Sequence, residues 1–368
     1  MAYRRSSFIG VALALLVSTA CDKKEGTAAT AETAKPSDGG VPHSSAEDKS
    51  IAEAVAQVAQ GSGGPGTPAG GPPENGVFAP GVADREMRPG DLPKIAVGSK
   101  GSGPTVHLVG GIPKAGKKFG ARMQIALQMG PRAAMPTIEL MFALDSPAAS
   151  TDPAAPAGPS KVVARVVGAK PAAASEQPGE LPPGTDKQIG KIKGSKVELD
   201  VGPNGGARVT AVTASPDMDE ALGVLLRSAS ESLVLLFLPY PTDPVGADAY
   251  WMVTSRETFA GLDVLSYRMV KVASIEGDHA SLGITTKRYV AGGQLGFQGI
   301  PPHHIEEFNG SATDQLIVTA SDPTMLHADL DDQLLGNLTP DGQSAPPGQP
   351  GGHMQVHLEF RSKVATGI

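Results

Sequence analysis

Two stretches of the sequence hold residue types that bind phosphate or metal ions in other proteins. The first, residues 111–118, reads GIPKAGKK and has the glycine and lysine spacing of a phosphate-binding loop. Such a loop needs serine or threonine directly after its lysine, because that hydroxyl group ligates magnesium, and a helix must follow. Lys118 stands in the hydroxyl position, and residues 119–129 alternate as a β-strand does. The stretch therefore predicts a turn before a strand.

The second stretch gathers histidine and glutamate in the last third of the chain. Imidazole and carboxylate groups are common zinc ligands, but a site needs three or four of them held together. No His-Glu-x-x-His pattern occurs and no Gly-x-Ser-x-Gly elbow, so we predict no metal, no cofactor and no enzymatic activity. The residues that a metal-dependent enzyme would use are His303, His304, Glu306, Glu307, His353, His357 and Glu359.

Cys21 is the only cysteine of the 368 residues, and it directly follows a targeting signal. Residues 1–20 combine Arg4 and Arg5 with an apolar stretch at 8–17 and the small residues Ser-Thr-Ala. A lone cysteine at this place resembles the lipobox of bacterial lipoproteins, whose cysteine is thioether-linked to diacylglycerol. The resemblance implies a lipid anchor on Cys21 and a location in the cell envelope, facing the periplasm or the cell surface. Ordinary secretory cleavage is the alternative, although it would leave a reactive free thiol.

The net negative charge of the chain excludes some classes of binding partner. Removing residues 1–20 takes away two arginines and no acid, so the formal net charge of the chain falls from −7 to −9. Such an acidic chain has no basis for sequence-independent binding of nucleic acid, because phosphate backbones repel it. Anionic membrane surfaces repel it as well, so we expect the acyl chains on Cys21 to provide the membrane anchor.

Composition divides the mature chain into two parts. Residues 21–103 are rich in alanine, glycine and proline and nearly free of aromatic side chains, which predicts a disordered tether. Residues 104–368 contain stretches that alternate between apolar and polar side chains, separated by turn-forming residues. They predict a mainly β (α+β) domain with a curved antiparallel sheet or half-barrel of about 8–10 strands.

One helix is expected inside this sheet, at residues 216–236. Ser215 and Asp217 are suitable N-caps, and Pro239 and Pro241 prevent continuation. Apolar residues recur at steps of three and four, which predicts one apolar face on this helix. The central residues of that face are Leu222, Leu225, Ala229 and Leu233.

A resemblance covers residues 117–365 and rests on a few positions. A hairpin at Asn204-Gly205, the helix and the stretch FLPYPTDPVG at 237–246 lead into Trp251. This arrangement resembles a group of uncharacterised bacterial envelope lipoproteins with a Pro-Val…Gly…Trp motif. Asp248 stands where those proteins often have glycine, which affects the turn before Trp251. The expected architecture is similar to that of lipoprotein carriers, whose half-barrel covers a helix and encloses an apolar cavity.

These observations support three hypotheses about function. In the first, the protein is an envelope lipoprotein that binds a lipid or acyl chain between sheet and helix, against Leu222, Leu225, Ala229, Leu233 and Trp251. In the second, the domain has a filled core, with Trp251 as a packing anchor, and acts as a structural or interaction module for another envelope protein. In the third, the histidines and glutamates form an enzyme site. A cavity favours the first hypothesis and a packed core the second.

Overall fold

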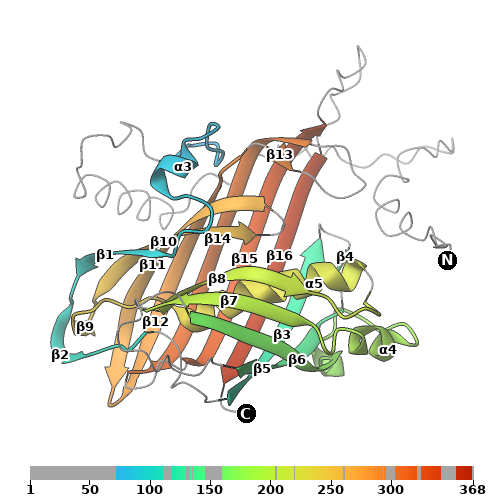
Figure 1. Cartoon of the computed structure of the whole chain (residues 1–368), viewed down its shortest axis with the longest axis horizontal. Helices are drawn as coiled ribbons and strands as arrows, with labels where there is room; N and C mark the ends of the chain where they lie inside the picture. The colour runs from blue at the N-terminus through green and yellow to red at the C-terminus, as the bar shows by residue number, and fades with distance from the viewer. Residues whose placement is uncertain are drawn as a thin grey trace, which may run out of the picture. The chain divides into compact units, whose positions relative to one another are not determined.

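The computed structural model describes residues 72–110, 118–129, 133–134, 136–145, 160–203, 205–218, 220–259, 262–292, 294–295, 303–320, 325–340 and 354–366 (Figure 1). Cys21 and residues 111–117 lie outside these ranges. Lipid attachment at Cys21 therefore stays a prediction. Lys118 begins a strand, as the alternation after the glycine-rich turn predicts.

One antiparallel sheet of fourteen strands dominates the described residues. Its main path runs β1-β10-β11-β12-β14-β15-β16-β3-β5-β6-β7-β8, while β4 pairs with β3 and β13 with β14. The pairing of β16 with β3 joins the two halves of the chain in one sheet. The strands are β1 (Lys94–Ser99), β3 (Lys118–Met129), β4 (Ala133–Ala134), β5 (Ile138–Asp145), β6 (Ser160–Pro171), β7 (Lys196–Gly202), β8 (Gly205–Thr213), β10 (Tyr250–Phe259), β11 (Leu262–Glu276), β12 (His279–Val290), β13 (Gln294–Leu295), β14 (His303–Thr319), β15 (Met325–Pro340) and β16 (Met354–Thr366). A second sheet pairs β2 (Ser102–Val106) with β9 (Val245–Ala247).

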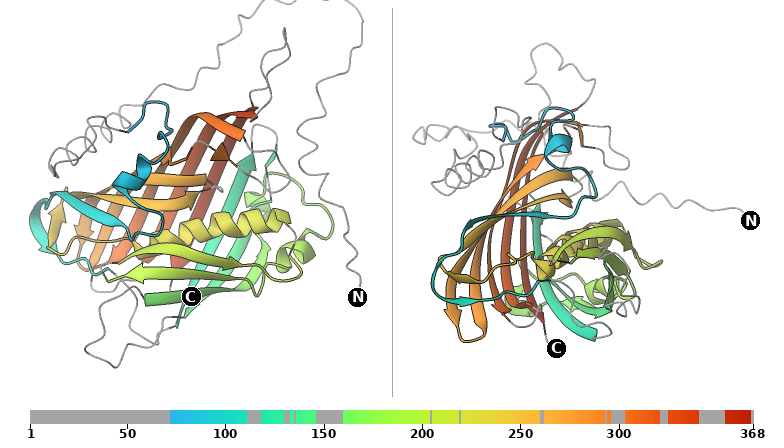
Figure 2. Two further views of the ribbon diagram at one scale, coloured as in Figure 1. Left: turned by 45° about the horizontal axis from the view of Figure 1, so that its top comes forward. Right: turned by 60° about the vertical axis from the view of Figure 1, so that its left-hand side comes forward.

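The large sheet curls, so that β6, β7 and β8 lie across the inner face of the remaining strands (Figure 2). A helix, α5, lies between these two parts of the sheet (Figure 2). This arrangement confirms the mainly β class and the curled antiparallel half-barrel. The sheet has more strands than the 8–10 expected, partly because β15 was not predicted. Its sequence ADLDDQLLGNL at 328–338 breaks the alternation of apolar and polar residues that identifies a strand.

The helix is shorter than the predicted range of 216–236. Helix α5 covers Glu220–Val234, and a 3-10 turn at Leu235–Phe237 ends it. The helix begins later in the sequence than predicted because the residues before it form a turn. Met218 N–H donates to the Ser215 carbonyl at 3.1 Å, and Ser215 N–H donates to Ser195 Oγ at 2.9 Å. The prediction of one long helix is therefore wrong in length, and α5 spans only about 22 Å.

The ordered domain begins before residue 104, in the segment that composition assigned to the tether. Residues 94–106 form β1, on the edge of the large sheet beside β10, and β2. Residues 72–93, which we call the strap, include the short helix α3 (Ala83–Glu86). The strap extends the sheet where β12 and β14 separate: Val290 N–H donates to the Gly76 carbonyl at 2.9 Å, and Phe308 N–H donates to the Asn75 carbonyl at 2.9 Å. Long-range backbone pairing orders a segment whose composition predicted disorder.

The predicted turns are confirmed. Gly205 has a φ of +81° in the β7–β8 hairpin, and Gly277 has a φ of +60° between β11 and β12. Asp248, which replaces an expected glycine, adopts a φ of +61°, the left-handed conformation that glycine favours. Its backbone N–H donates to the Val272 carbonyl at 3.1 Å, which holds the turn before Trp251 against β11.

Buried apolar side chains form three clusters among the described residues. The main core lies between α5, the large sheet and β5–β8. A strap cluster packs Phe78, Ala83 and Met87 on the outer face of β10–β12. An end cluster closes the far end of these strands and comprises Phe259, Leu262, Val264, Val290, Ile305 and Phe308. No described helix has the length and apolar character needed to cross a membrane.

Candidate functional site

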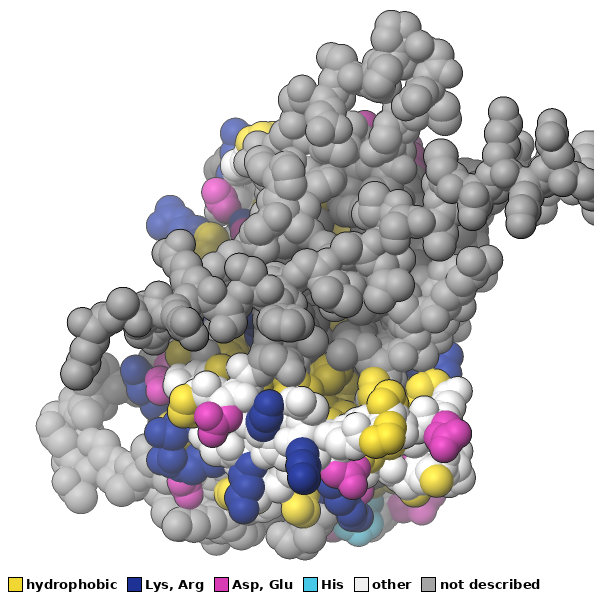
Figure 3. All heavy atoms as spheres, turned by 90° about the vertical axis from the view of Figure 1, so that its right-hand side faces the viewer, with side chains coloured by type: hydrophobic (Ala, Val, Ile, Leu, Met, Phe, Trp, Pro, Cys, Tyr) yellow, Lys and Arg dark blue, Asp and Glu magenta, His cyan; other side chains and the backbone are white. Residues whose placement is uncertain are grey.

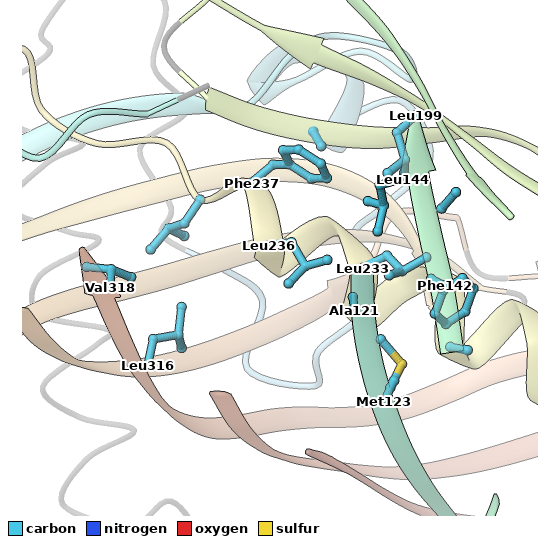
Figure 4. Close-up of a cluster of buried hydrophobic side chains, with 14 of the residues drawn as sticks. Ala121, Met123, Phe142, Leu144, Leu199, Leu233, Leu236, Phe237, Leu316 and Val318 are labelled. Atoms are coloured by element: carbon cyan, nitrogen blue, oxygen red, sulfur yellow. The ribbon is translucent and has the colours of Figure 1, made fainter. Parts of the chain in front are cut away.

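The five residues predicted to contact a ligand all lie in the main core. Leu222, Leu225, Ala229 and Leu233 project from α5, and none of these side chains is more than 7% exposed. Trp251 on β10 is fully buried. Figure 4 shows Leu233 among side chains of the sheet that include Phe142. The predicted wall is therefore covered by other side chains of the same chain.

Trp251 has partners for both its ring and its N–H group. Its Nε1 donates to the Pro239 carbonyl at 3.2 Å. Its ring and that of Tyr240 pack in an edge-to-face arrangement, with 6.1 Å between centroids. These contacts make Trp251 the packing anchor that joins β10 to the segment after α5. This is the arrangement expected for a filled core.

The histidines and glutamates are not brought together by the strand pairing. On β16 His357 pairs with Leu335 of β15, and Leu335 pairs with Asn309 of β14, six residues from His303. Six residues of strand span about 20 Å, too far for a shared metal. Residues 304, 306 and 307 are exposed, while His353 lies outside the described residues. No group of three or more potential metal ligands occurs within the ranges that the structure describes.

A set of buried polar residues, not predicted from the sequence, lies on the inner face of β10, β11 and β12. Along each strand the inward side chains change in the same order, from the main core to polar residues to the end cluster. On β10, for example, Trp251 and Val253 are followed by two polar residues and then by Phe259. We call the polar rows the charged belt. It consists of Ser255 and Glu257 on β10, Ser266 and Arg268 on β11, and Thr286 and Arg288 on β12.

Strand register places the belt residues next to each other. Ser255 pairs with Ser266, which pairs with Arg288, and Arg268 pairs with Thr286. Because side chains of directly paired residues lie on the same face, these residues form two adjacent rows, one across β10–β12 and one across β11 and β12. Glu257 lies in the next row, where it pairs with Val264. The side chains of Arg268 and Arg288 are 5% and 4% exposed. The belt therefore holds two arginines that are almost completely removed from water.

Glu257 is the acceptor at the centre of the belt. Arg268 donates from one terminal nitrogen to both carboxylate oxygens of Glu257, at 2.7 Å each. Its other terminal nitrogen donates to Ser255 Oγ at 2.5 Å, and Ser266 Oγ donates to Glu257 at 2.5 Å. Arg288 Nε lies 3.5 Å from Glu257, so one carboxylate serves two guanidinium groups.

Arg288 also contacts the end cluster. Its guanidinium carbon lies 4.1 Å from the centre of the Phe259 ring, a cation–π geometry that is favourable away from water. The arginine thus connects the polar rows to the apolar residues beyond them. Any group bound at this point would meet positive charge and an aromatic surface together.

The two belt arginines keep Glu257 in its ionised form. Burial acts to raise the pKa of Glu257, but the charges of Arg268 and Arg288 and the hydrogen bonds from Arg268 and Ser266 outweigh it and hold that pKa at about 2. Glu257 is therefore ionised at neutral pH, and the belt carries two positive charges against one negative. A second buried acid, Asp314, faces inward on β14 two residues from Ala312, the partner of Thr286, so it borders the Thr286 side of the belt; four residues, or about 13 Å, separate it from Gly310, the partner of Arg288.

Two of the six belt residues, Arg268 and Thr286, each hold a buried polar atom without a hydrogen-bond partner among the residues that the structure describes. These atoms are Thr286 Oγ1, on a fully buried residue, and Arg268 Nε. Buried donors and acceptors are almost always satisfied in folded proteins, so each such atom needs an explanation. A bound ligand or water molecule would provide the missing partner.

Sequence reasoning missed the belt because both faces of these strands are covered. Polar residues that alternate with apolar ones indicate a solvent-exposed face, and Arg268 and Arg288 follow that pattern. In the structure the apolar Leu265 and Tyr267 face the strap cluster while Ser266 and Arg268 face the interior. One feature of the sequence does indicate this burial. Apolar residues occur at both odd-numbered and even-numbered positions of β11, which is typical of a strand that is buried on both faces.

Comparisons with known proteins add little about the site. No family model and no curated protein matches the sequence. A solved structure described as lipid-protein interactions in lipovitellin is similar over 70% of this chain and 26% of that chain, with 10% sequence identity and a TM-score of 0.42. The chain thus spans about a quarter of that chain's length. A similarity at this score carries no information about what the present chain binds.

Proposed function

We propose that this protein is a membrane-anchored lipoprotein of the cell envelope whose β domain binds an amphipathic ligand, a lipid or acyl chain with an anionic head group. The observation that supports it most is the charged belt. Two buried arginines share one carboxylate between two apolar clusters, an arrangement suited to an acidic head group joined to hydrocarbon. Perturbed buried ionisable groups of this kind gather at functional sites more often than elsewhere.

The chemistry assigned to the belt is binding, without a reaction. Arg268 and Arg288 would attract and orient a carboxylate or phosphate, and Thr286 Oγ1 would donate the hydrogen bond that it lacks in the structure. Glu257 keeps the two arginines from repelling each other when no ligand is bound. The proposed ligand site is therefore the belt, in place of the adjacent face of α5, where the core is filled.

The anchor is tested by changing Cys21→Ser. The full chain should then leave the membrane fraction, because acyl burial is the strong membrane affinity that we assign to it. If the Cys21→Ser chain still sediments with membranes and resists alkaline carbonate, lipid attachment at Cys21 is not the anchor. The released chain is also the material for ligand measurements.

The binding site is tested with a fluorescent fatty acid and its uncharged methyl ester. The Cys21→Ser chain should bind the acid about tenfold or more tightly than the ester, because a hydrogen bond to a charged group is worth about 1.5–3 kcal/mol. Thr286→Val should weaken acid binding while leaving ester binding unchanged. Thr285→Val is the matched control, because Thr285 lies next in sequence and faces away from the belt. Equal affinity for acid and ester would remove the belt from the proposal.

The second function, an interaction module without a ligand, is favoured by the filled main core. Leu225 is 1% exposed and Ala229 and Leu233 are fully buried, so these described side chains of α5 are covered by the rest of the core. A chain that binds neither the acid nor the ester, but remains stably folded, would fit this function instead.

A further inference from the structure

Four lysines gather at the end of the domain where β6 leads into β7. We call them the lysine patch: Lys187 on α4 (Thr185–Gly190), Lys191 and Lys193 in the turn that follows, and Lys196 at the start of β7. None has an ion-pair partner in the part of the chain that the structure describes. Figure 3 shows this end of the molecule, where Lys and Arg side chains are exposed with Asp and Glu side chains among them.

The lysine patch is held on a fixed support. Ile189 and Ile192, which alternate with the lysines, are buried in the main core and anchor α4 and the turn. The turn is also tied to β6, because Gly194 N–H donates to the Val166 carbonyl at 2.9 Å and Val166 N–H donates to the Ser195 carbonyl at 3.0 Å. The four lysines are therefore carried by one continuous segment that is anchored to the core.

The patch contrasts with the charge of the whole protein. Residues 185–197 contain four lysines and a single acid, Asp186, in a chain whose formal net charge is −7. A local surplus of positive charge on an acidic protein creates a directional attraction toward anionic surfaces. Arg165, which pairs in register with Lys196, adds a further positive group, partly offset by Asp145 at 3.6 Å.

We infer that the lysine patch docks the domain on the anionic head groups of the membrane that holds the lipid anchor. The choice of this partner rests on the proposed anchor at Cys21. The described domain begins at Pro72, and the 50 residues that connect it to Cys21 can extend at most about 180 Å, so the domain stays near the bilayer. Lysines recognise charge density without a fixed shape, which suits mobile lipid head groups.

Docking through this patch also defines an orientation. In Figure 1, α4 and the strap lie at opposite ends of the domain. Contact of α4 with the bilayer would therefore leave the strap end, with the end cluster behind it, away from the lipid surface. The protein would then have two membrane attachments, one covalent and one electrostatic, at opposite ends of the domain.

The test uses the unlipidated full chain, Cys21→Ser, and vesicles of phosphatidylcholine alone or mixed with phosphatidylglycerol. We expect binding only to the mixed vesicles, and release at high salt because screening weakens attraction between exposed charges. Replacing the four patch lysines by glutamine should reduce the partition coefficient by more than tenfold, since each lysine near an anionic surface contributes about fivefold. The control replaces four exposed lysines outside the patch by glutamine and changes the net charge equally: Lys94, Lys100, Lys271 and Lys363.

The control variant should keep binding to mixed vesicles within about twofold of the parent chain, apart from the general effect of net charge. Equal losses in both quadruple variants would show that net charge alone governs binding and would overturn the assignment to the patch. Absence of binding to mixed vesicles at low salt would also overturn it. Neither result affects the lipid anchor or the belt, because the assay uses an unlipidated chain and requires no ligand.

Discussion

Replacing Glu257 by glutamine removes the one negative charge that serves both belt arginines. Glutamine keeps the size of the side chain and can still accept a hydrogen bond, so the substitution acts mainly on charge. Arg268 and Arg288 would then lie side by side in the interior without a counter-charge at the centre of the belt. Loss of one partner from a buried ion pair is strongly destabilising, because the remaining charge stays buried.

The magnitude follows from the pKa of Glu257. Its ordinary value of 4.5 is lowered to about 2 in the folded chain. This difference corresponds to about 3 kcal/mol of folding free energy that depends on the ionised carboxylate. The contribution is fully present above pH 4.5 and is lost as pH falls toward 2, because the folded pKa lies below the unfolded one. Glu257→Gln should therefore be about 3 kcal/mol less stable at pH 7.

Urea denaturation of the Cys21→Ser chain and its Glu257→Gln variant, at a series of pH values, measures this difference. The gap in unfolding free energy should be constant from pH 7 down to about 5, then close progressively toward pH 2. Other carboxyl groups titrate equally in both chains, so they cancel in the comparison. A gap below about 0.5 kcal/mol at pH 7, or one that does not change with pH, would refute the assigned role of Glu257.

Two further substitutions test the packing around the belt. Leu225→Trp should lower the unfolding free energy by about 1–3 kcal/mol through overpacking, because Leu225 is only 1% exposed; an unchanged free energy would show that α5 borders free space. Arg256→Leu should make the strap sensitive to limited proteolysis, because Arg256 donates to Asp263 at 2.6 Å and to the Met87 carbonyl at 3.0 Å. The control is Arg85→Leu, which changes an exposed arginine of the strap. Equal resistance of the two variants to proteolysis would contradict this role of Arg256.

The parts of the fold that depend on local pattern could be predicted from the sequence. Residues at steps of three and four, such as Leu222 and Leu225, identified the buried face of α5. The hairpin turn at Gly205 followed from its need for a positive φ. These features are determined by residues that lie close together in the chain, so a short stretch of sequence is enough to predict them.

The start of the domain could not be predicted, because its order comes from distant residues. The strap is held by backbone hydrogen bonds to Val290 and Phe308 and by the side chain of Arg256, more than 150 residues away. Its own composition, rich in glycine and proline, indicates a tether. Hydrogen bonding to β12 and β14 overrides that local preference.

The charged belt was missed for a related reason. Arginine is rarely buried, so Arg268 and Arg288 indicate an exposed face when the sequence is considered alone. They are buried because they face the inside of the curled sheet, and the curl is not visible in the strands themselves. The strap covers the opposite face of β10–β12. The wall on α5 was identified correctly as apolar, but sequence pattern does not distinguish a filled core from a cavity.

Native mass spectrometry of the gently purified Cys21→Ser chain tests the proposed ligand most directly. We predict a population that carries the added mass of an acidic lipid or fatty acid, which is lost on delipidation and restored by adding a fatty acid. The Thr286→Val variant should carry less of this mass than the Thr285→Val control. A chain that shows only its own mass before and after addition of the fatty acid would contradict the proposal.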